Sequence, residues 1–183
     1  MIPVIDLAPY LEKRPGAYAA TAAELGRALR DVGFFVIVSH GIPQTLIDAT
    51  FAEARRFHAQ SMEGKLALRM NEHNNGYMML GRYAVWTSDV NANDKPDLNE
   101  AFFIKRERGP DDPLVRAGRR FAGPNQWPAN LPGFREAVLA YTDAVDALGR
   151  QLLPLCATAL DLPPDTFDGA FAESQFKIGR AHV

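Results

Sequence analysis

The sequence predicts a mixed α/β fold in which helices and strands alternate along one chain. Three observations support this class. Apolar residues recur at helical spacing in several segments, short apolar runs of strand length lie between them, and 47% of the 183 residues are hydrophobic, which is enough for a packed core. The predicted strands are few and have few visible pairing partners, and an isolated strand pair is only marginally stable. The sequence therefore indicates a helical layer that needs further strands to complete its sheet.

The first two elements are a short strand over residues 3–7 and a helix over about 17–32. Gly33 follows the helix, at the position where a C-terminal glycine is common. The helix is predicted because its apolar residues recur three or four positions apart, which places them on one face. These residues are Ala22, Leu25, Leu29 and Val32.

A second strand and a second helix are predicted next. Residues 34–38 are the longest apolar run, and because they do not alternate with polar residues we expect a strand that is buried on both faces. A turn over 39–43 then leads into a helix that runs to about Ser61. One stripe of that helix carries Ile47, Phe51, Ala54 and His58.

The middle of the chain is less regular. The tripeptide 74–76 is a turn signal, 101–104 is a strand candidate, and 105–130 is rich in charge, glycine and proline. This last segment is expected to be a long surface connection, and its basic residues a solvated loop.

The strongest helical pattern covers residues 132–159. Its apolar stripe is typical of one amphipathic core helix. A coiled-coil seam is the less favoured alternative, because the run is short and Pro154 is expected to interrupt it. A short helix from about Pro163 to Ala172 and a strand over 174–178 complete the predicted elements.

Composition excludes several function classes. The formal net charge of −2 argues against nucleic-acid binding and against attraction to anionic lipid. No apolar run is long enough to span a membrane, and no secretory leader is expected. Cys156 is the one cysteine, which fits a reducing compartment, so we expect a cytoplasmic protein. The oligomeric state is left open.

The motifs in the sequence do not form a recognisable active site. None of the four histidines is followed two positions later by a carboxylate, as a strand-borne iron site requires. We expect His40 to be a turn residue, His58 a packing residue, His73 an exposed loop residue and His182 part of a frayed end. Residues 89–100 resemble a calcium loop, but Asp94 occupies the position that requires glycine, so a polar loop is favoured.

The chain resembles the N-terminal region of the isopenicillin N synthase-like iron(II)/2-oxoglutarate-dependent dioxygenases. The resemblance covers residues 2–177 and depends on several motifs that occur in the family's order. They are the segments 2–7, 33–43 and 56–65, then Gly76-Tyr77, Asp97 to Phe102, Asn125 to Pro128, and Leu131 to Arg135 with the long helix.

The resemblance implies a double-stranded β-helix, or jelly roll, with helices packed on one sheet. It also implies iron(II) and 2-oxoglutarate as cofactors and a small molecule as substrate. The family's iron ligands and 2-oxoglutarate residues belong to the roll, so the resemblance assigns no catalytic, cofactor-binding or metal residue in this chain. Asn75, Tyr77 and Arg82 are weak candidates for the substrate-side wall. A structural turn with an exposed arginine is the favoured alternative for these residues.

The resemblance also divides the chain. Residues 1–130 are the dioxygenase N-terminal region, and 131–177 hold the long core helix, a short helix and the first strand that leads into the roll. Residues 178–183 resemble a translated sequencing adapter, so we expect a non-native tail. Because the resemblance places the metal-binding half outside this chain, we expect the fragment to be inactive alone. The functional alternative is a standalone, non-catalytic domain that binds a protein partner through an exposed sheet edge.

Overall fold

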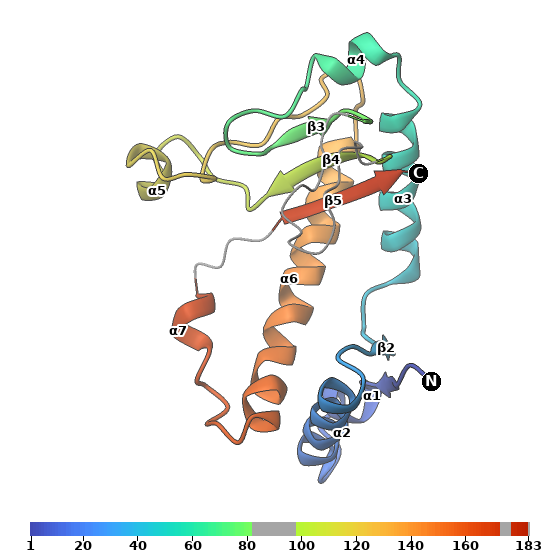
Figure 1. Ribbon diagram of the computed structural model, residues 1–183, viewed down its shortest axis with the longest axis vertical. Coiled ribbons are helices and arrows are strands. Elements are labelled where there is room, and N and C mark those ends of the chain that lie inside the picture. The colour runs from blue at the N-terminus through green and yellow to red at the C-terminus, as the bar shows by residue number, and fades with distance from the viewer. Residues whose placement is uncertain (82–97, 173–176, 183) are drawn as a thin grey trace, which may run out of the picture. The chain divides into compact units, whose positions relative to one another are not determined.

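Helices and strands alternate along the chain in the computed structural model, which describes residues 1–81, 98–172 and 177–182 (Figure 1). The chain divides into two compact units. The first comprises Met1–Ile47 and Leu139–Ser174, and the second Asp48–Val138 and Gln175–Val183. Each unit has its own small sheet and its own cluster of buried apolar side chains. The predicted mixed α/β class is confirmed at this level.

The first unit contains a two-stranded parallel sheet and several helical segments. β1 (Val4–Asp6) pairs with β2 (Val36–Val38), and Ile5 lies opposite Ile37. These strands confirm the two that were predicted near the N-terminus. The helical segments are α1 (Ala8–Leu11), α2 (Ala17–Asp31), the C-terminal part of α6 (Phe134–Ala159) and α7 (Asp168–Phe171).

The core of the first unit lies between α2, β1 and α6. Leu25 of α2 is fully buried and belongs to one apolar cluster with Ile5 and Leu155. Helix α2 approaches α6 closely at Gly26, where an added Cβ would lie 3.3 Å from the Cβ of Ala159. Gly33 ends α2 as predicted: its φ is 91°, and its N–H donates to the Ala28 carbonyl at 3.1 Å.

The prediction that the second strand is buried on both faces is wrong. Val36 is 48% exposed and Val38 41%, and Phe34, just before the strand, is 55% exposed. Ile37 points the other way and packs on the core cluster of this unit. The physical reason is that, within the described residues, no further layer covers the second face of this two-stranded sheet, which leaves Val36 and Val38 exposed.

The second unit contains a three-stranded antiparallel sheet in the order β3–β4–β5 (Figure 1). Strand β4 (Glu100–Lys105) confirms the strand predicted over 101–104, whereas β3 (Gly76–Met78) was not predicted. Strand β5 (Lys177–His182) lies later than the one predicted and includes residues of the adapter-like tail. The helices here are most of α3 (Gln44–His58), α4 (Met62–Leu66), α5 (Pro113–Arg116) and the start of α6.

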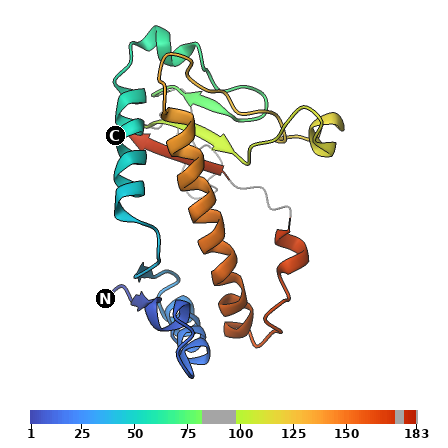
Figure 2. The ribbon, with the colours of Figure 1, turned by 180° about the vertical axis from the view of Figure 1, so that it is seen from behind.

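Helix α6 confirms the long core helix and continues through Pro154 to Ala159, so the expected interruption does not occur (Figure 2). Two tyrosines of the first unit donate to carbonyls near this proline. The Tyr10 hydroxyl bonds the Gln151 carbonyl at 2.8 Å, and the Tyr18 hydroxyl bonds the Pro154 carbonyl at 2.9 Å. Within the described residues, no helix combines the length and apolar character that a membrane span requires.

Candidate functional site

The candidate site of the second unit is built on one face of β4. Because side chains alternate along a strand, Glu100, Phe102 and Ile104 share a face. Tyr77 of β3 pairs with Phe102, which places it on the same face. Phe57 of α3 packs there, with its ring centroid 4.4 Å from that of Phe102. The result is an aromatic core with a carboxylate at one end.

The Glu100 carboxylate is surrounded by hydrogen-bond partners from three other elements. Its Oε1 lies 3.0 Å from His58 Nδ1 at the end of α3. Its Oε2 accepts from Lys65 Nζ of α4 at 3.0 Å and from the hydroxyl of Tyr77. The side chains of His58, Lys65 and Glu100 are only 8%, 9% and 12% exposed. We call these four residues the Glu100 cluster.

The electrostatics of the cluster keep Glu100 ionised. Burial alone would raise the pKa of this carboxyl, but the hydrogen bonds from Tyr77, Lys65 and His58, together with the charge of Lys65, outweigh burial and lower the pKa to about 2. For Tyr77, burial and then the bond to Glu100 both raise the pKa of the phenol well above its ordinary value. Glu100 is therefore an anion at neutral pH, and Tyr77 a neutral donor.

The prediction for His58 was incomplete. Its ring does pack edge-on against Phe57, with centroids 5.4 Å apart, as a packing residue would. Its Nδ1 also faces Glu100, which no local sequence pattern indicates, because the two residues are 42 positions apart. His40 meets its prediction, since its Nδ1 accepts from the N–H of Ile42 within the turn at 3.1 Å.

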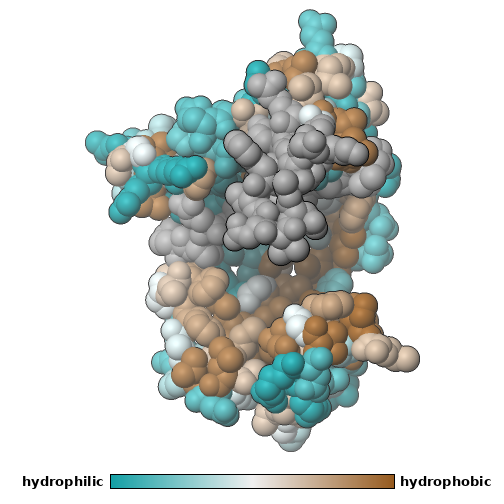
Figure 3. Space-filling view, viewed as in Figure 1, coloured by the Kyte–Doolittle hydropathy of each residue, from teal (hydrophilic) through white to brown (hydrophobic). Residues whose placement is uncertain are grey.

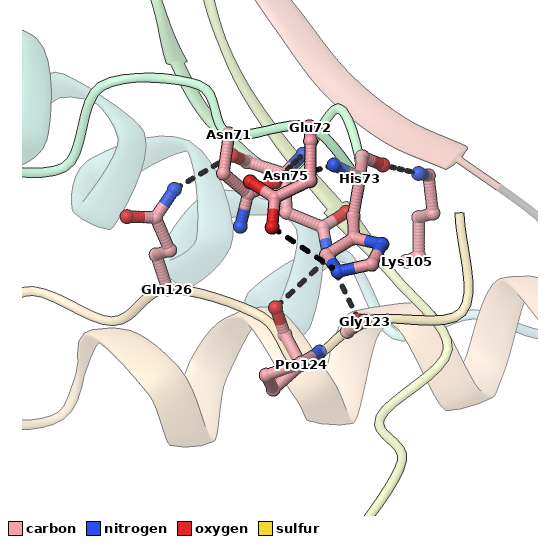
Figure 4. A network of polar contacts seen from close by, with 8 residues as sticks. All are labelled: Asn71, Glu72, His73, Asn75, Lys105, Gly123, Pro124 and Gln126. Carbon is pink, nitrogen blue, oxygen red and sulfur yellow. Dashed lines mark hydrogen bonds and ion pairs between the residues drawn. The ribbon is translucent and has the colours of Figure 1, made fainter. Parts of the chain in front are cut away.

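A second polar network surrounds Asn75 and joins two loops (Figure 4). The Asn75 side chain is fully buried, and its Nδ2 donates to the carbonyls of Gly123 and Pro124, both at 3.0 Å. Its backbone carbonyl accepts from Gln126 Nε2 at 2.7 Å. The turn before it is held by Asn71, whose Oδ1 accepts from the N–H of Asn75 at 3.1 Å. Asn75 thus fastens the turn that precedes β3 to residues 123–126.

The amide orientation of Asn75 follows from these bonds. Both Nδ2 hydrogens point at carbonyl oxygens, and a flipped amide would place oxygen against oxygen. In this orientation Oδ1 is buried and has no hydrogen-bond partner among the residues that the structure describes. Beside it, Lys105 Nζ donates to the carbonyl of His73, and the half-buried His73 ring lies where a side chain at Gly123 would stand. The prediction of an exposed loop residue for His73 is therefore wrong.

The structure describes two of the three substrate-wall candidates. Asn75 and Tyr77 are both fully buried and lie two residues apart, each anchored in one of the two networks. Arg82 lies outside the described residues, as does most of the calcium-like loop over 89–100. Sequence reasoning did not identify Glu100 and Lys65 as site residues, because their partners are distant along the chain.

The described residues do not provide a donor set for iron. No group of three or more His, Cys, Asp or Glu side chains comes together among residues 1–81 and 98–172. The Glu100 cluster offers one carboxylate and one imidazole, and its other members are a protonated amine and a phenol. These groups already satisfy the carboxylate oxygens, so the cluster does not fit a divalent metal.

Comparison with known proteins matches this chain to the N-terminal region of a dioxygenase family. Residues 2–130 match the family described as non-haem dioxygenase in morphine synthesis, N-terminal. The chain is 33% identical over 171 residues to a 2-oxoglutarate-Fe(II) type oxidoreductase of Emericella nidulans, covering 91% of this chain and 48% of that protein. It is 32% identical over 189 residues to a homoarginine-6-hydroxylase of Glycine max, covering 98% of this chain and 54% of the relative.

Solved structures agree in fold. A Caulobacter crescentus protein assigned to the 2OG-Fe(II) oxygenase family superposes with a TM-score of 0.74 at 27% identity, over 91% of this chain and 51% of that one. A full-length Neurospora crassa protein solved in complex with alpha-KG gives a TM-score of 0.73 at 25% identity, over 91% and 50%. The chain spans about half the length of the curated relatives it matches.

Proposed function

The chain belongs to the non-haem dioxygenase family through its N-terminal region, and we propose that it is part of an iron(II)- and 2-oxoglutarate-dependent oxygenase that oxidises a small molecule. The observation that carries the proposal is the family match over residues 2–130. Relatives named for 2-oxoglutarate-Fe(II) oxidoreduction and for homoarginine hydroxylation support the reaction class. The compartment is proposed to be the cytoplasm.

We propose that two halves of a longer parent protein carry different parts of the oxygenase function. The iron ligands and the 2-oxoglutarate site are assigned to a jelly roll formed by a part of the parent outside this chain, because the described residues offer no fitting donor set. When bound, iron and 2-oxoglutarate supply the oxidant that attacks a C–H bond of the substrate, while protein groups hold that bond in place. The fragment alone is proposed to be inactive.

Within this division, the present chain contributes to the substrate-side wall. Asn75 fixes the turn before β3 through the carbonyls of Gly123 and Pro124, and Tyr77 fixes β3 itself through Glu100. Both side chains are buried, so their role in the wall is to hold the backbone that carries it. Arg82 remains a proposed wall residue from the family resemblance.

Three experiments test the proposed function. Sequencing the locus should reveal a downstream His-x-Asp and a distal His, and should show that the genome does not encode the hexapeptide 178–183. The complete reading frame, expressed and loaded with iron(II), should then convert 2-oxoglutarate to succinate. In contrast, anaerobic titration of the 183-residue chain with iron(II) and 2-oxoglutarate should show no stoichiometric binding. Stoichiometric binding would refute the proposal that the iron and 2-oxoglutarate sites lie outside this chain.

A standalone binding domain is the second candidate, favoured by the exposed valines of β2 and by the open edges of a two-stranded sheet. Such a domain needs no downstream iron motif. If the natural gene ends near residue 177 and the chain binds a protein partner through β1 or β2, the oxygenase proposal is replaced by this one.

A further inference from the structure

We propose that Glu100 is the positioning residue for Tyr77 and, through Tyr77, for strand β3 in the substrate-side wall. The link to substrate rests on the proposed function. The positioning itself rests on the geometry of the Glu100 cluster and can be tested without any enzymatic activity.

Tyr77 is buried and its position is restricted by its neighbours. Its side chain is fully buried against Phe57 and Phe102, so its hydroxyl cannot reach bulk water. A buried hydroxyl without a partner is costly, and Glu100 Oε2 accepts its hydrogen bond. Tyr77 therefore lies where its ring fills the aromatic core and its hydroxyl meets the carboxylate.

The Glu100 carboxylate is itself held from two sides. His58 lies against Oε1 and Lys65 against Oε2, each at 3.0 Å, so the group cannot rotate without losing a partner. Lys65 Nζ also lies 5.3 Å from the centroid of the Tyr77 ring. Within the cluster, Tyr77 therefore contacts Lys65 from α4 and Glu100 from β4, and His58 from α3 faces Glu100.

Strand β3 is short. It pairs with β4 through three residues, from Gly76 opposite Phe103 to Met78 opposite Ala101. On its other edge, the backbone of Tyr77 donates to the Leu68 carbonyl and accepts from the N–H of Met70. Because these backbone bonds are few, a side-chain anchor contributes strongly to the register. Tyr77 is the middle residue of the strand. Its bond to Glu100, the first residue of β4, therefore locks β3 in place.

The decisive variant is Glu100→Gln in the 183-residue chain, followed by proton NMR of the Tyr77 hydroxyl and by amide exchange. In the wild type we expect a downfield hydroxyl resonance that disappears in Tyr77→Phe, which assigns it. In Glu100→Gln the acceptor is neutral, so we expect this resonance to move upfield and its exchange to quicken at least tenfold. The β3 amides should exchange at least tenfold faster as well.

A matched control is Glu107→Gln. Glu107 also takes three donors, from Asn125, Trp127 and Arg135, but it lies outside the Glu100 cluster. This variant should leave the Tyr77 resonance and the β3 exchange unchanged. If Glu100→Gln fails to fold because Lys65 is left charged and unpaired, Glu100→Gln with Lys65→Met removes both charges and gives the same readout.

An unchanged Tyr77 hydroxyl and unchanged β3 exchange in a folded Glu100 variant would overturn the positioning role. In the complete oxygenase, Glu100→Gln should raise the KM for the substrate severalfold with a smaller effect on kcat. If the complete protein shows no 2-oxoglutarate turnover, the proposed function fails, while the NMR result still decides the role of Glu100.

Discussion

A buried carboxylate remains ionised only where donors replace the water it has lost, and Glu100 has three such partners. The negative charge of Glu100 acts mainly on the other three residues of the Glu100 cluster. Together with burial, which is the larger cause, it raises the pKa of Tyr77. It also balances the charge of Lys65, and it leaves His58 to act as a donor through Nδ1, which requires hydrogen on that nitrogen. Changes at this one residue should therefore be visible in stability and in its pH dependence.

The lowered pKa of Glu100 predicts a loss of stability in acid. The folded-state pKa of about 2 lies below the ordinary value of 4.5, so the unfolded chain binds this proton more readily. The stabilisation is complete above pH 4.5 and is lost as the pH falls from 4.5 towards 2. Urea denaturation followed by fluorescence should show a falling midpoint over this range, and the fall should be smaller in Glu100→Gln. Glu12→Gln, at an exposed ion pair, should keep the wild-type profile.

Asn75 allows a test with an almost isosteric change. Asn75→Asp replaces the Nδ2 donor with an oxygen that faces the carbonyls of Gly123 and Pro124. Two buried hydrogen bonds are lost and two acceptors lose their partner, so we expect a destabilisation of about 2–3 kcal/mol in chemical denaturation. Asn130→Asp, at an exposed bond to Gln60, should change stability by less than about 0.5 kcal/mol. Equal effects in the two variants would contradict the role given to Asn75.

At the scale of elements, β3 depends on the backbone of Gly76. Its φ is 106°, which L side chains rarely adopt, and an added Cβ would collide with the Leu68 carbonyl and the Gln126 amide. Gly76→Ala should therefore lower the free energy of unfolding by about 2 kcal/mol or more and increase exchange of the β3 amides. Gly109→Ala is the control, because no atom lies within 4 Å of its Cβ position. A stable Gly76→Ala variant with protected β3 amides would refute this account.

Elements with a local signal were predictable from sequence. The apolar spacing over Ala22 and Leu25 and the long stripe of α6 each predict a buried face without knowledge of the partner. The last two members of the predicted α2 face, Leu29 and Val32, are exposed instead. Strand β3 gives no such signal, because it is three residues long and is defined by pairing with β4. The burial of β2 was mispredicted for a related reason. An apolar run is compatible with burial on both faces of a strand. Whether both faces are covered depends on segments that are distant in the sequence.

Some residues of the candidate site could likewise be predicted from local sequence, and others could not. Tyr77 belongs to the Gly76-Tyr77 motif that resembles a known family, and Asn75 belongs to the turn signal just before it, so the sequence could point to both residues. The Glu100 cluster was invisible, since Tyr77, Lys65 and His58 are 23, 35 and 42 positions from Glu100. Local patterns cannot bring such residues together. The family resemblance did include the Asp97 to Phe102 motif that contains Glu100, but it assigned no role to that residue.

At the scale of the whole molecule, the two-stranded sheet of the first unit is the feature that the described residues leave incomplete. Val4 and Val36 are a register pair and both are exposed, as is Val38, so one face of this sheet is apolar and uncovered. Figure 3 shows brown, apolar surface around these N-terminal strands. Parallel sheets are ordinarily covered on both faces, and the relatives are about twice as long as this chain. The further chain of a longer parent is our proposed cover.

This exposed face predicts self-association of the 183-residue chain. Contiguous apolar surface drives contacts between copies, so sedimentation velocity should detect oligomers that grow with concentration, together with strong binding of an apolar dye. Val36→Thr with Val38→Thr keeps the branched shape that suits a strand but adds hydroxyls, and it should shift the population towards monomer. Leu160→Thr changes an exposed leucine that follows α6 and is not part of the sheet, and it should have little effect. A monomeric wild type with a sharp, cooperative thermal transition would show that this face needs no cover, and would favour the standalone domain over the oxygenase half.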